Sequence, residues 1–333
     1  MAYTTIDNPE LYFQVKAYAG TGSSNAQTFD GDEDMQPDLV WIKNRDQALN
    51  WMMFDAVRGT TKYFYSNLTE AEGTNDPATI LTAFGSDGFT VGANNNVNQS
   101  SNDIVAICWK ESATAGFDIV GYTGNETART QAHSLSAVPH VMIVKNRETT
   151  DDWNVYHHKN TSAPETDYLN LHDDGATSDY HEFWNDTVPT SGVFSLGAST
   201  GVNDDLGMIA YLWSEKQGFS KFGSYTGNGN NDGTYVHTGF APAFVLIKKS
   251  SASGTSWVIF DNKRNTFNER SRILQTNDNG AEETSTNRID FTSNGFKLRG
   301  TWTVINNSGD TYIYMAFAEA PFVNSNGVPC NAR

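Results

Sequence analysis

The sequence predicts an all-β protein of three tandem antiparallel β-sandwiches, each of about 100 residues and of jelly-roll or lectin-like layout. One strand-like phrase, a proline followed by an apolar run and a lysine, is written three times. Its prolines are Pro37, Pro139 and Pro242, which lie 102 and 103 residues apart. The composition also favours strands and tight turns, with 14 Tyr, 19 Phe and 28 Gly. A fixed period of this length indicates repeated domains.

Further landmarks recur at the same period and define the units. Trp51, Trp153 and Trp257 are 102 and 104 residues apart, and each opens a short apolar strand. Each unit closes on an apolar strand, at residues 104–110, 208–213 and 312–317. We therefore divide the chain into an N-terminal arm (1–14), three sandwich repeats (15–116, 117–217 and 218–319) and an extended C-terminal tail (320–333).

The elements of the first unit illustrate the pattern. Strands are expected at 15–19, 38–44, 51–55, 62–66, 88–92 and 104–110. Proline at the head of the second strand suits a strand start, where no ladder donor is lost. The segment 225–233 has the turn chemistry of a hairpin in the third unit. Each unit is long enough for its own core, and linkers of about three to six residues predict one rigid body.

Charge and cysteine content exclude several classes. The formal net charge is −17, which argues against a nucleic-acid groove and against an anionic membrane surface. No stretch is long and apolar enough to be inserted in a membrane, and the N-terminus shows no secretory signal. Cys108 and Cys330 do not form a disulfide framework, so a reducing site of folding such as a cytoplasm fits best.

No residue pattern indicates a metal or another cofactor, and none is predicted. The acidic stretch 29–34 has the alternating spacing that opens a calcium loop, but Met35 and Trp41 stand where Gly and Glu are needed. Six of the seven histidines fall in the second unit, without ligand spacing. His157 and His158 are adjacent on a strand and would point to opposite faces.

The sequence predicts no catalytic residue and no enzyme. Glycoside hydrolysis needs two carboxylates across a cleft. Glu111, Glu215 and Glu319 stand just past the closing strand of each unit, and such repetition favours a structural role. Asp55 with Arg58, and its counterpart in the third unit, are expected to form a local ion pair.

Aromatic residues supply the candidate binding residues. The repeated tryptophans are expected in the core or on a sheet face. Trp41, Trp184 and Trp302 are not repeated, and Trp184 and Trp302 are the candidates for stacking on a glycan. Phe13 and Phe322, one in each terminal segment, are the expected assembly contacts.

Several phrases resemble a family of structural proteins of unassigned function from phages of marine bacteria. These are residues 144–147, 184–187, 222–229, 312–319 and 321–327. The resemblance implies a tail-fibre, appendage or head-surface protein and carries no catalytic residues with it.

We therefore expect a virion structural protein of a bacteriophage with a role in host attachment or assembly, made in the host cytoplasm. Its expected partners are other virion proteins, further copies of itself, with a trimer favoured, and a host surface glycan, but not nucleic acid. The alternatives are a lectin-like receptor-binding protein or a tail-spike glycoside hydrolase.

Overall fold

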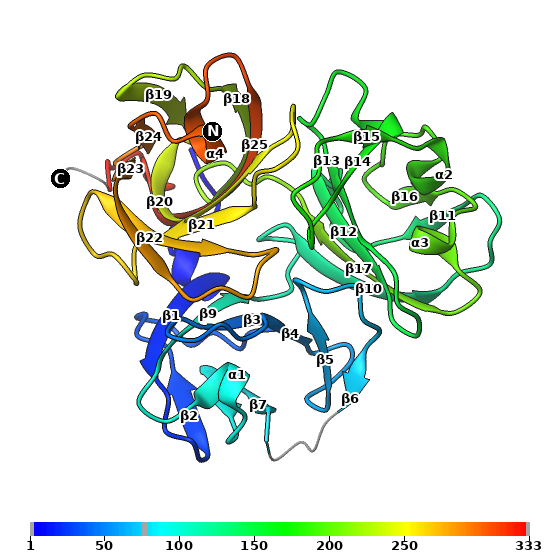
Figure 1. The fold of residues 1–333 in the computed structure, drawn as a ribbon, viewed down its shortest axis with the longest axis horizontal. Coiled ribbons are helices and arrows are strands. Elements are labelled where there is room, and N and C mark those ends of the chain that lie inside the picture. The colour runs from blue at the N-terminus through cyan, green and yellow to red at the C-terminus, as the bar shows by residue number, and fades with distance from the viewer. Residues whose placement is uncertain (1–2, 75–78, 331–333) are drawn as a thin grey trace.

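The computed structural model describes residues 3–74 and 79–330 and shows an all-β protein. Strands make up 44% of the chain and helices 7%, and every strand pairing is antiparallel. The predicted all-β sandwich class is confirmed. Figure 1 shows three lobes arranged around a common centre, and we name them by their strands: the first lobe holds β1–β9, the second β10–β17 and the third β18–β25.

A large sheet forms the inner layer of each lobe. In the first lobe its order is β1 (Phe13–Ala19), β9 (Asp103–Trp109), β3 (Leu39–Asn44), β4 (Met52–Asp55), β5 (Lys62–Tyr65) and β6 (Gly73–Thr74). In the second it is β10 (Phe117–Thr123), β17 (Gly207–Trp213), β12 (Val141–Asn146), β13 (Trp153–His157), β14 (Asp167–Asn170) and β15 (Ser178–Asp179). In the third it is β18 (Ser220–Thr226), β25 (Thr311–Pro321), β20 (Phe240–Lys249), β21 (Val258–Asp261), β22 (Arg270–Gln275), β23 (Glu283–Thr292), β24 (Gly295–Arg299) and β19 (Asp232–His237).

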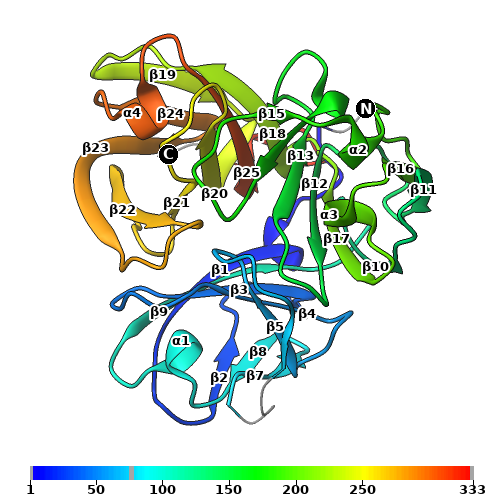
Figure 2. The ribbon, with the colours of Figure 1, turned by 45° about the vertical axis from the view of Figure 1, so that its right-hand side comes forward.

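The outer layer is smaller and differs between lobes. It consists of β2 (Asn25–Thr28), β8 (Gly88–Val91) and β7 (Leu81–Gly85) in the first lobe, and of β11 (Arg129–Ala132) and β16 (Val193–Leu196) in the second. In the third lobe β23, β24 and β19 continue the large sheet instead. Figure 2 shows β2, β7 and β8 on the side of the first lobe that faces away from the other two.

Short helical turns complete the lobes. They are η1 (Pro9–Leu11), α1 (Asn95–Asn98), η2 (Pro164–Thr166), α2 (His181–Trp184), α3 (Thr200–Asn203) and α4 (Thr303–Asn306). Within the described part of the chain, no helix combines the length and the apolar character that crossing a membrane requires.

The three large sheets agree in strand order and in register. In each lobe the first strand pairs with the last over seven residues, as in Phe13 with Trp109, Phe117 with Trp213 and Ser220 with Phe317. The last strand then pairs with the strand that follows the repeated proline. Internal triplication remains the prediction that accounts for this correspondence.

The strands after the repeated prolines are buried on both faces, because each face meets a different core. In β3, Leu39 and Trp41 belong to a core shared by all three lobes, whereas Val40 and Ile42 belong to a core inside the first lobe. The same alternation holds in β12 and β20. A period of two on a strand sends neighbouring side chains to opposite faces. The expectation of separate cores therefore holds for one face of these strands, whereas the other face packs in the shared core.

The repeated tryptophans join the lobes in a ring. Each is buried in the shared core, and each indole Nε1–H donates to a backbone carbonyl of the neighbouring lobe. Trp51 bonds to Gln275 (2.8 Å), Trp153 to Leu68 (3.0 Å) and Trp257 to Asn170 (2.9 Å). These bonds run from the first lobe to the third, from the second to the first and from the third to the second. The chain thus closes on itself rather than forming a string.

A backbone contact repeats at each seam between lobes. The N–H groups of Glu282, Glu72 and Thr177 donate to the carbonyls of Arg45, Arg147 and Ser250 at 2.6, 2.7 and 3.0 Å. At two seams the side chains pair as well, Arg45 with Glu282 (2.8 Å) and Arg147 with Glu72 (3.0 Å). The third seam has Ser250 at the arginine position.

Candidate functional site: a pocket in the third lobe

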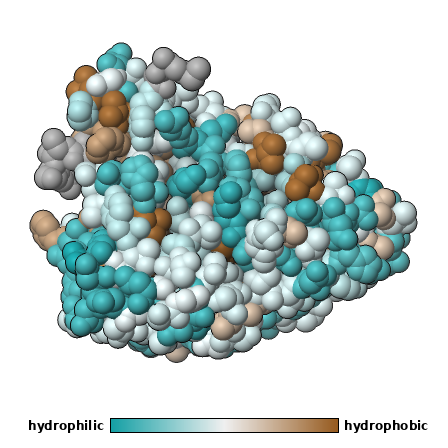
Figure 3. Space-filling view, turned by 90° about the horizontal axis from the view of Figure 1, so that it is seen from above, coloured by the Kyte–Doolittle hydropathy of each residue, from teal (hydrophilic) through white to brown (hydrophobic). Residues whose placement is uncertain are grey.

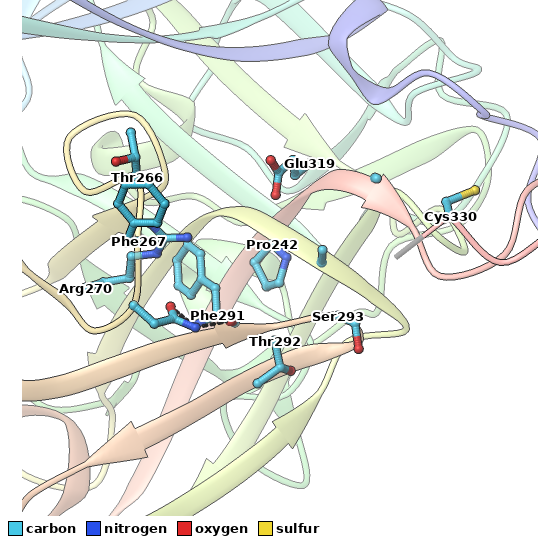
Figure 4. A pocket seen from close by; sticks show the side chains of 12 residues that line it. Pro242, Thr266, Phe267, Arg270, Phe291, Thr292, Ser293, Glu319 and Cys330 are labelled. Atoms are coloured by element: carbon cyan, nitrogen blue, oxygen red, sulfur yellow. Dashed lines mark hydrogen bonds between the residues drawn. The ribbon is translucent and has the colours of Figure 1, made fainter. Parts of the chain in front are cut away.

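A pocket of about 520 Å³ opens on the third lobe between β20, the end of β25 and the loop that follows β21. Figure 4 shows Thr266, Phe267 and Arg270 on one side, Cys330 on the other, and Pro242 and Glu319 between them. Its full lining is Ala241, Pro242, Thr266, Phe267, Asn268, Arg270, Phe291, Thr292, Ser293, Glu319, Ala320 and Cys330. Its volume falls within the range of roughly 300–1,000 Å³ typical of small-molecule sites.

Longer strands distinguish this part of the third lobe. β20 and β25 have 10 and 11 residues, whereas their counterparts in the first lobe, β3 and β9, have 6 and 7. The extension makes Pro242 and Glu319 part of strands, although both positions have counterparts in the other two units. The pocket therefore combines repeated positions with strand extensions that the third lobe has in addition.

The aromatic side of the pocket combines one buried and one exposed ring. Phe291 on β23 is 7% exposed, and the Arg270 guanidinium lies 5.1 Å from its ring centroid. Phe267, in the loop between β21 and β22, is 81% exposed. Burial in the hydrophobic core explains the position of Phe291, whereas the exposed position of Phe267 has no such explanation.

Hydrogen bonds hold this loop to the sheet. The side-chain amide of Asn268 donates to the Phe291 carbonyl (2.6 Å) and accepts from the Phe291 N–H (2.9 Å). The Asn265 side chain accepts from the N–H groups of Ser271 and Arg272 at 3.0 and 2.8 Å. These two asparagines stand on either side of Phe267 in the chain, and their side-chain amides bond backbone groups of β22 and β23, which holds the segment that carries Phe267.

A family model described as a domain of unknown function, DUF7483, matches residues 8–321. The chain belongs to the DUF7483 family. A search of curated proteins found no match.

The predicted glycan-stacking residues of this DUF7483 protein do not form an open platform. Trp184 is 1% exposed, lies in the core of the second lobe, and its indole N–H donates to the Asp167 carbonyl at 3.0 Å. Trp302 is half-buried, and the Arg288 guanidinium lies 4.4 Å from its ring centroid. The structure corrects the prediction for Trp184, because a buried indole cannot stack on a sugar. Neither residue lines the pocket.

The predicted arms of the DUF7483 protein are also corrected. Phe13 is 2% exposed, and its ring stacks on that of Phe317 at 4.6 Å, so it joins the first strand to the third lobe of the same chain. The segment before it is bound too, since Tyr3 donates to the Gly239 carbonyl at 2.6 Å. Phe322 is 37% exposed and remains available for a contact.

Both terminal segments meet on the third lobe. Thr4 is buried, and a side chain on Gly218, which has a φ of +77°, would approach Thr4 Cβ to 2.9 Å. The Ser325 N–H donates to Asp7 at 2.7 Å. The first two residues of the predicted tail, 320–321, belong to β25. The described parts of both segments are therefore docked rather than free.

The three equivalent glutamates have three different environments. Glu111 is half-buried, and desolvation together with a hydrogen bond to Asp118 raises its pKa to about 7. Burial disfavours the charged form of Glu215, but hydrogen bonds from His158, Lys221 and the Phe222 N–H lower its pKa to about 2. Glu319 lines the pocket. Divergent surroundings at one repeated position do not support a catalytic role common to the lobes.

Three of the six histidines of the second lobe, His140, His157 and His158, lie together at its seam with the third lobe. The rings of His140 and His158 are 4.4 Å apart, and His157 Nε2 lies 3.2 Å from the Tyr314 carbonyl. Burial lowers the pKa of His140 to about 4 and that of His157 to about 3. Among residues 3–74 and 79–330, no group of three or more His, Cys, Asp or Glu side chains is placed to hold a metal ion.

Buried polar residues that sequence reasoning missed account for other repeated phrases. Asn98, Asn203 and Asn306 are fully buried, and their amides donate to the carbonyls of Gly92, Gly197 and Gly300 at 2.7, 2.8 and 2.8 Å. The tyrosine of each Tyr-Thr-Gly or Tyr-Ala-Gly phrase bonds the carbonyl just before this asparagine. In the sequence, these asparagines can be recognised by the Val-Asn or Ile-Asn pair that recurs before each closing strand. These residues are structural.

Proposed function

We propose that this DUF7483 protein is a structural component of a phage particle, in a tail fibre, an appendage or the capsid surface, with a role in adhesion or assembly. The phrases at 222–229, 312–319 and 321–327, which resemble phage structural proteins, support the proposal. Synthesis in the host cytoplasm and incorporation into the virion are parts of it.

The closed ring of lobes is the observation that carries this proposal. The residues that the chain repeats serve the fold: the indoles of Trp51, Trp153 and Trp257 bond across the seams. A ring with one shared core is rigid and presents its outer faces to partners. These properties suit a building block that binds and holds, whereas the repeated glutamates offer no common pair of carboxylates for hydrolysis.

The proposed partners bind on the outer surface, because the ring already buries the inner faces of the sheets. Figure 3 shows one face on which polar residues dominate and apolar residues form small, separate groups. Phe322 and Val328, which is 56% exposed, are apolar side chains near the C-terminus that a neighbouring virion protein or a second copy can cover. A homotrimer remains the proposed assembly, and it would use such outer contacts.

Fractionation of phage particles tests the proposal. Particles are purified through two successive density gradients, and peptides of this chain are quantified by mass spectrometry against the major capsid protein. We expect a constant ratio across the particle peak and through both gradients. Recovery of the protein only from the soluble lysate, with none in the particle peak, would refute the structural role. A host cytoplasmic protein quantified in the same fractions controls for carry-over.

A second candidate, lectin-like glycan binding, is favoured by one observation. The pocket of the third lobe pairs an exposed aromatic ring with polar side chains. A hydrolase would require sustained release of reducing ends from a polysaccharide. Loss of that release in Glu319→Gln would favour the enzyme over both proposals.

A further inference from the structure

We infer that the pocket of the third lobe binds a neutral oligosaccharide, with Phe267 as the stacking platform. The inference deepens the adhesive part of the proposed function and places it at a defined site. Four features support it: the exposure of Phe267, the anchoring of its loop, the polar groups of the pocket and the charge of the chain.

Phe267 is unusually exposed for a phenylalanine. At 81% it exceeds every other exposed large hydrophobic side chain in the described part of the chain, of which Val328 (56%) is the next. Leaving a phenyl ring in water forgoes the stabilisation that burial would give. Isolated exposed apolar groups are common, but this one forms the wall of a concave pocket. A pyranose ring has one face made of C–H groups, and that face packs on an aromatic ring.

Side-chain hydrogen bonds anchor the loop that carries Phe267. Asn268 bonds both backbone groups of Phe291, and Asn265 accepts from two backbone N–H groups of β22. Just before the loop, Arg264 and Asp261 form a buried ion pair. The platform is therefore held before any ligand arrives. A preorganised site loses less conformational entropy on binding than a mobile loop.

The pocket is also lined by polar side chains. The lining includes the carboxylate of Glu319, the hydroxyls of Thr266 and Ser293, and the guanidinium of Arg270, which is 7% exposed and donates to the Asn265 carbonyl. Sugar hydroxyls also donate and accept, so a mixed set of this kind can satisfy several of them at once. Figure 4 shows Arg270 on the same side as Phe267, and Glu319 nearer the centre of the pocket. The pocket therefore combines an aromatic wall with polar groups.

Charge selects the class of glycan. The chain carries a formal net charge of −17, whereas the described residues of the pocket itself hold one carboxylate, that of Glu319, and one guanidinium, that of Arg270. The net charge of the chain disfavours polysaccharides rich in uronate or sulfate, because like charges brought together repel. A neutral oligosaccharide meets no such penalty.

Binding to immobilised neutral glycans tests the inference. The probes are glucan, mannan, galactan and N-acetylhexosamine oligomers, with sulfated and uronate oligomers alongside, and the best binder is then titrated by calorimetry. We expect saturable binding to a neutral member. Phe267→Ala should weaken it about tenfold or more, since burial of such a ring contributes roughly that much to affinity. Glu319→Gln should weaken it less, because the amide keeps one acceptor.

Tyr180→Ala provides the matched control. Tyr180 is an aromatic side chain 38% exposed on the second lobe, so its removal should leave the affinity unchanged. Thermal melting of Phe267→Ala should match that of the parent protein, since the Phe267 ring is exposed. Tyr180→Ala removes a ring that packs on Phe183, so its melting is measured to confirm that the variant is folded.

Three results would overturn the inference: no neutral oligomer binds at millimolar concentration, only anionic oligomers bind, or Phe267→Ala binds as tightly as the parent. None of these results bears on the outcome of the particle fractionation. Failure of this site is therefore distinguishable from failure of the proposed structural role.

Discussion

The replacement of a buried lysine tests the electrostatics of the seams most directly. Lys43, Lys145 and Lys248 occupy the same position after the repeated prolines, and all are fully buried. Desolvation lowers the pKa of each to about 8. Lys145 Nζ donates to the Thr69 carbonyl of the first lobe at 3.1 Å. We select Lys145→Met, because methionine has a similar shape and the Asp151 N–H still bonds that carbonyl at 2.9 Å.

The direction of the pH effect follows from the two pKa values of Lys145. In the unfolded chain the lysine pKa is about 10.4, and in the folded protein it is about 8. Between these values the unfolded state binds more protons, so stability increases with pH through this window. A difference of about 2.4 pKa units corresponds to a cost of about 3 kcal/mol at pH 7. About 1 kcal/mol of that cost remains at pH 9.5.

The assay is urea denaturation of the parent protein and Lys145→Met at pH 7 and at pH 9.5. The free energy of unfolding of the parent minus that of the variant should increase by about 2 kcal/mol between the two pH values. Taking this difference cancels the ionisation of Cys108 and of the buried tyrosines, which both proteins share. A difference that stays constant within about 0.5 kcal/mol, or that decreases, would show that Lys145 titrates normally and would refute the reasoning.

Three further predictions concern the seams and the buried polar groups. Trp257→Phe keeps the ring in the core but removes the bond to the Asn170 carbonyl across the seam, so the free energy of unfolding measured in urea should decrease by about 1–3 kcal/mol. Asn203→Ala leaves several buried backbone groups without a partner and should cost about 2–4 kcal/mol in the same measurement. His140 has its pKa lowered to about 4 by burial, so the unfolded state binds more protons below pH 6.5 and stability decreases as the pH falls from 6.5 to 4. His140→Gln should lose less stability over that range in thermal melts.

Each of these predictions has a control and a contradicting result. Trp302→Phe, at a half-buried indole, should change stability little, and equal losses in Trp257→Phe and Trp302→Phe would argue against the seam bond. Asn230→Ala, in an exposed turn, is the control for Asn203→Ala, and a loss below about 0.5 kcal/mol in Asn203→Ala would contradict its role. An unchanged acid response in His140→Gln would place the acid sensitivity in other groups.

The sequence alone determined the strand content and the alternation that builds the sheets. Proline, apolar alternation and turn residues act over a few neighbours, so their effects can be recognised in a linear pattern. The burial of Trp51, Trp153 and Trp257 and the ion pair of Asp55 with Arg58 were predicted for the same reason. Local rules sufficed for the ion pair because Arg58 lies three residues from Asp55, and for the burial of the tryptophans because each opens an apolar strand, although their indoles bond across the seams.

Only the tertiary structure decided which face of each strand meets which core, how the chain closes, and where the pocket lies. Leu39 and Val40 are both apolar, and nothing in their order shows that one faces the other lobes and the other its own. Phe13 stacks on Phe317, about 300 residues away, and a pattern of neighbours cannot register that contact. Trp184 and Phe267 show the same limit: their exposure depends on what packs against them, and the packing residues come from distant segments of the chain.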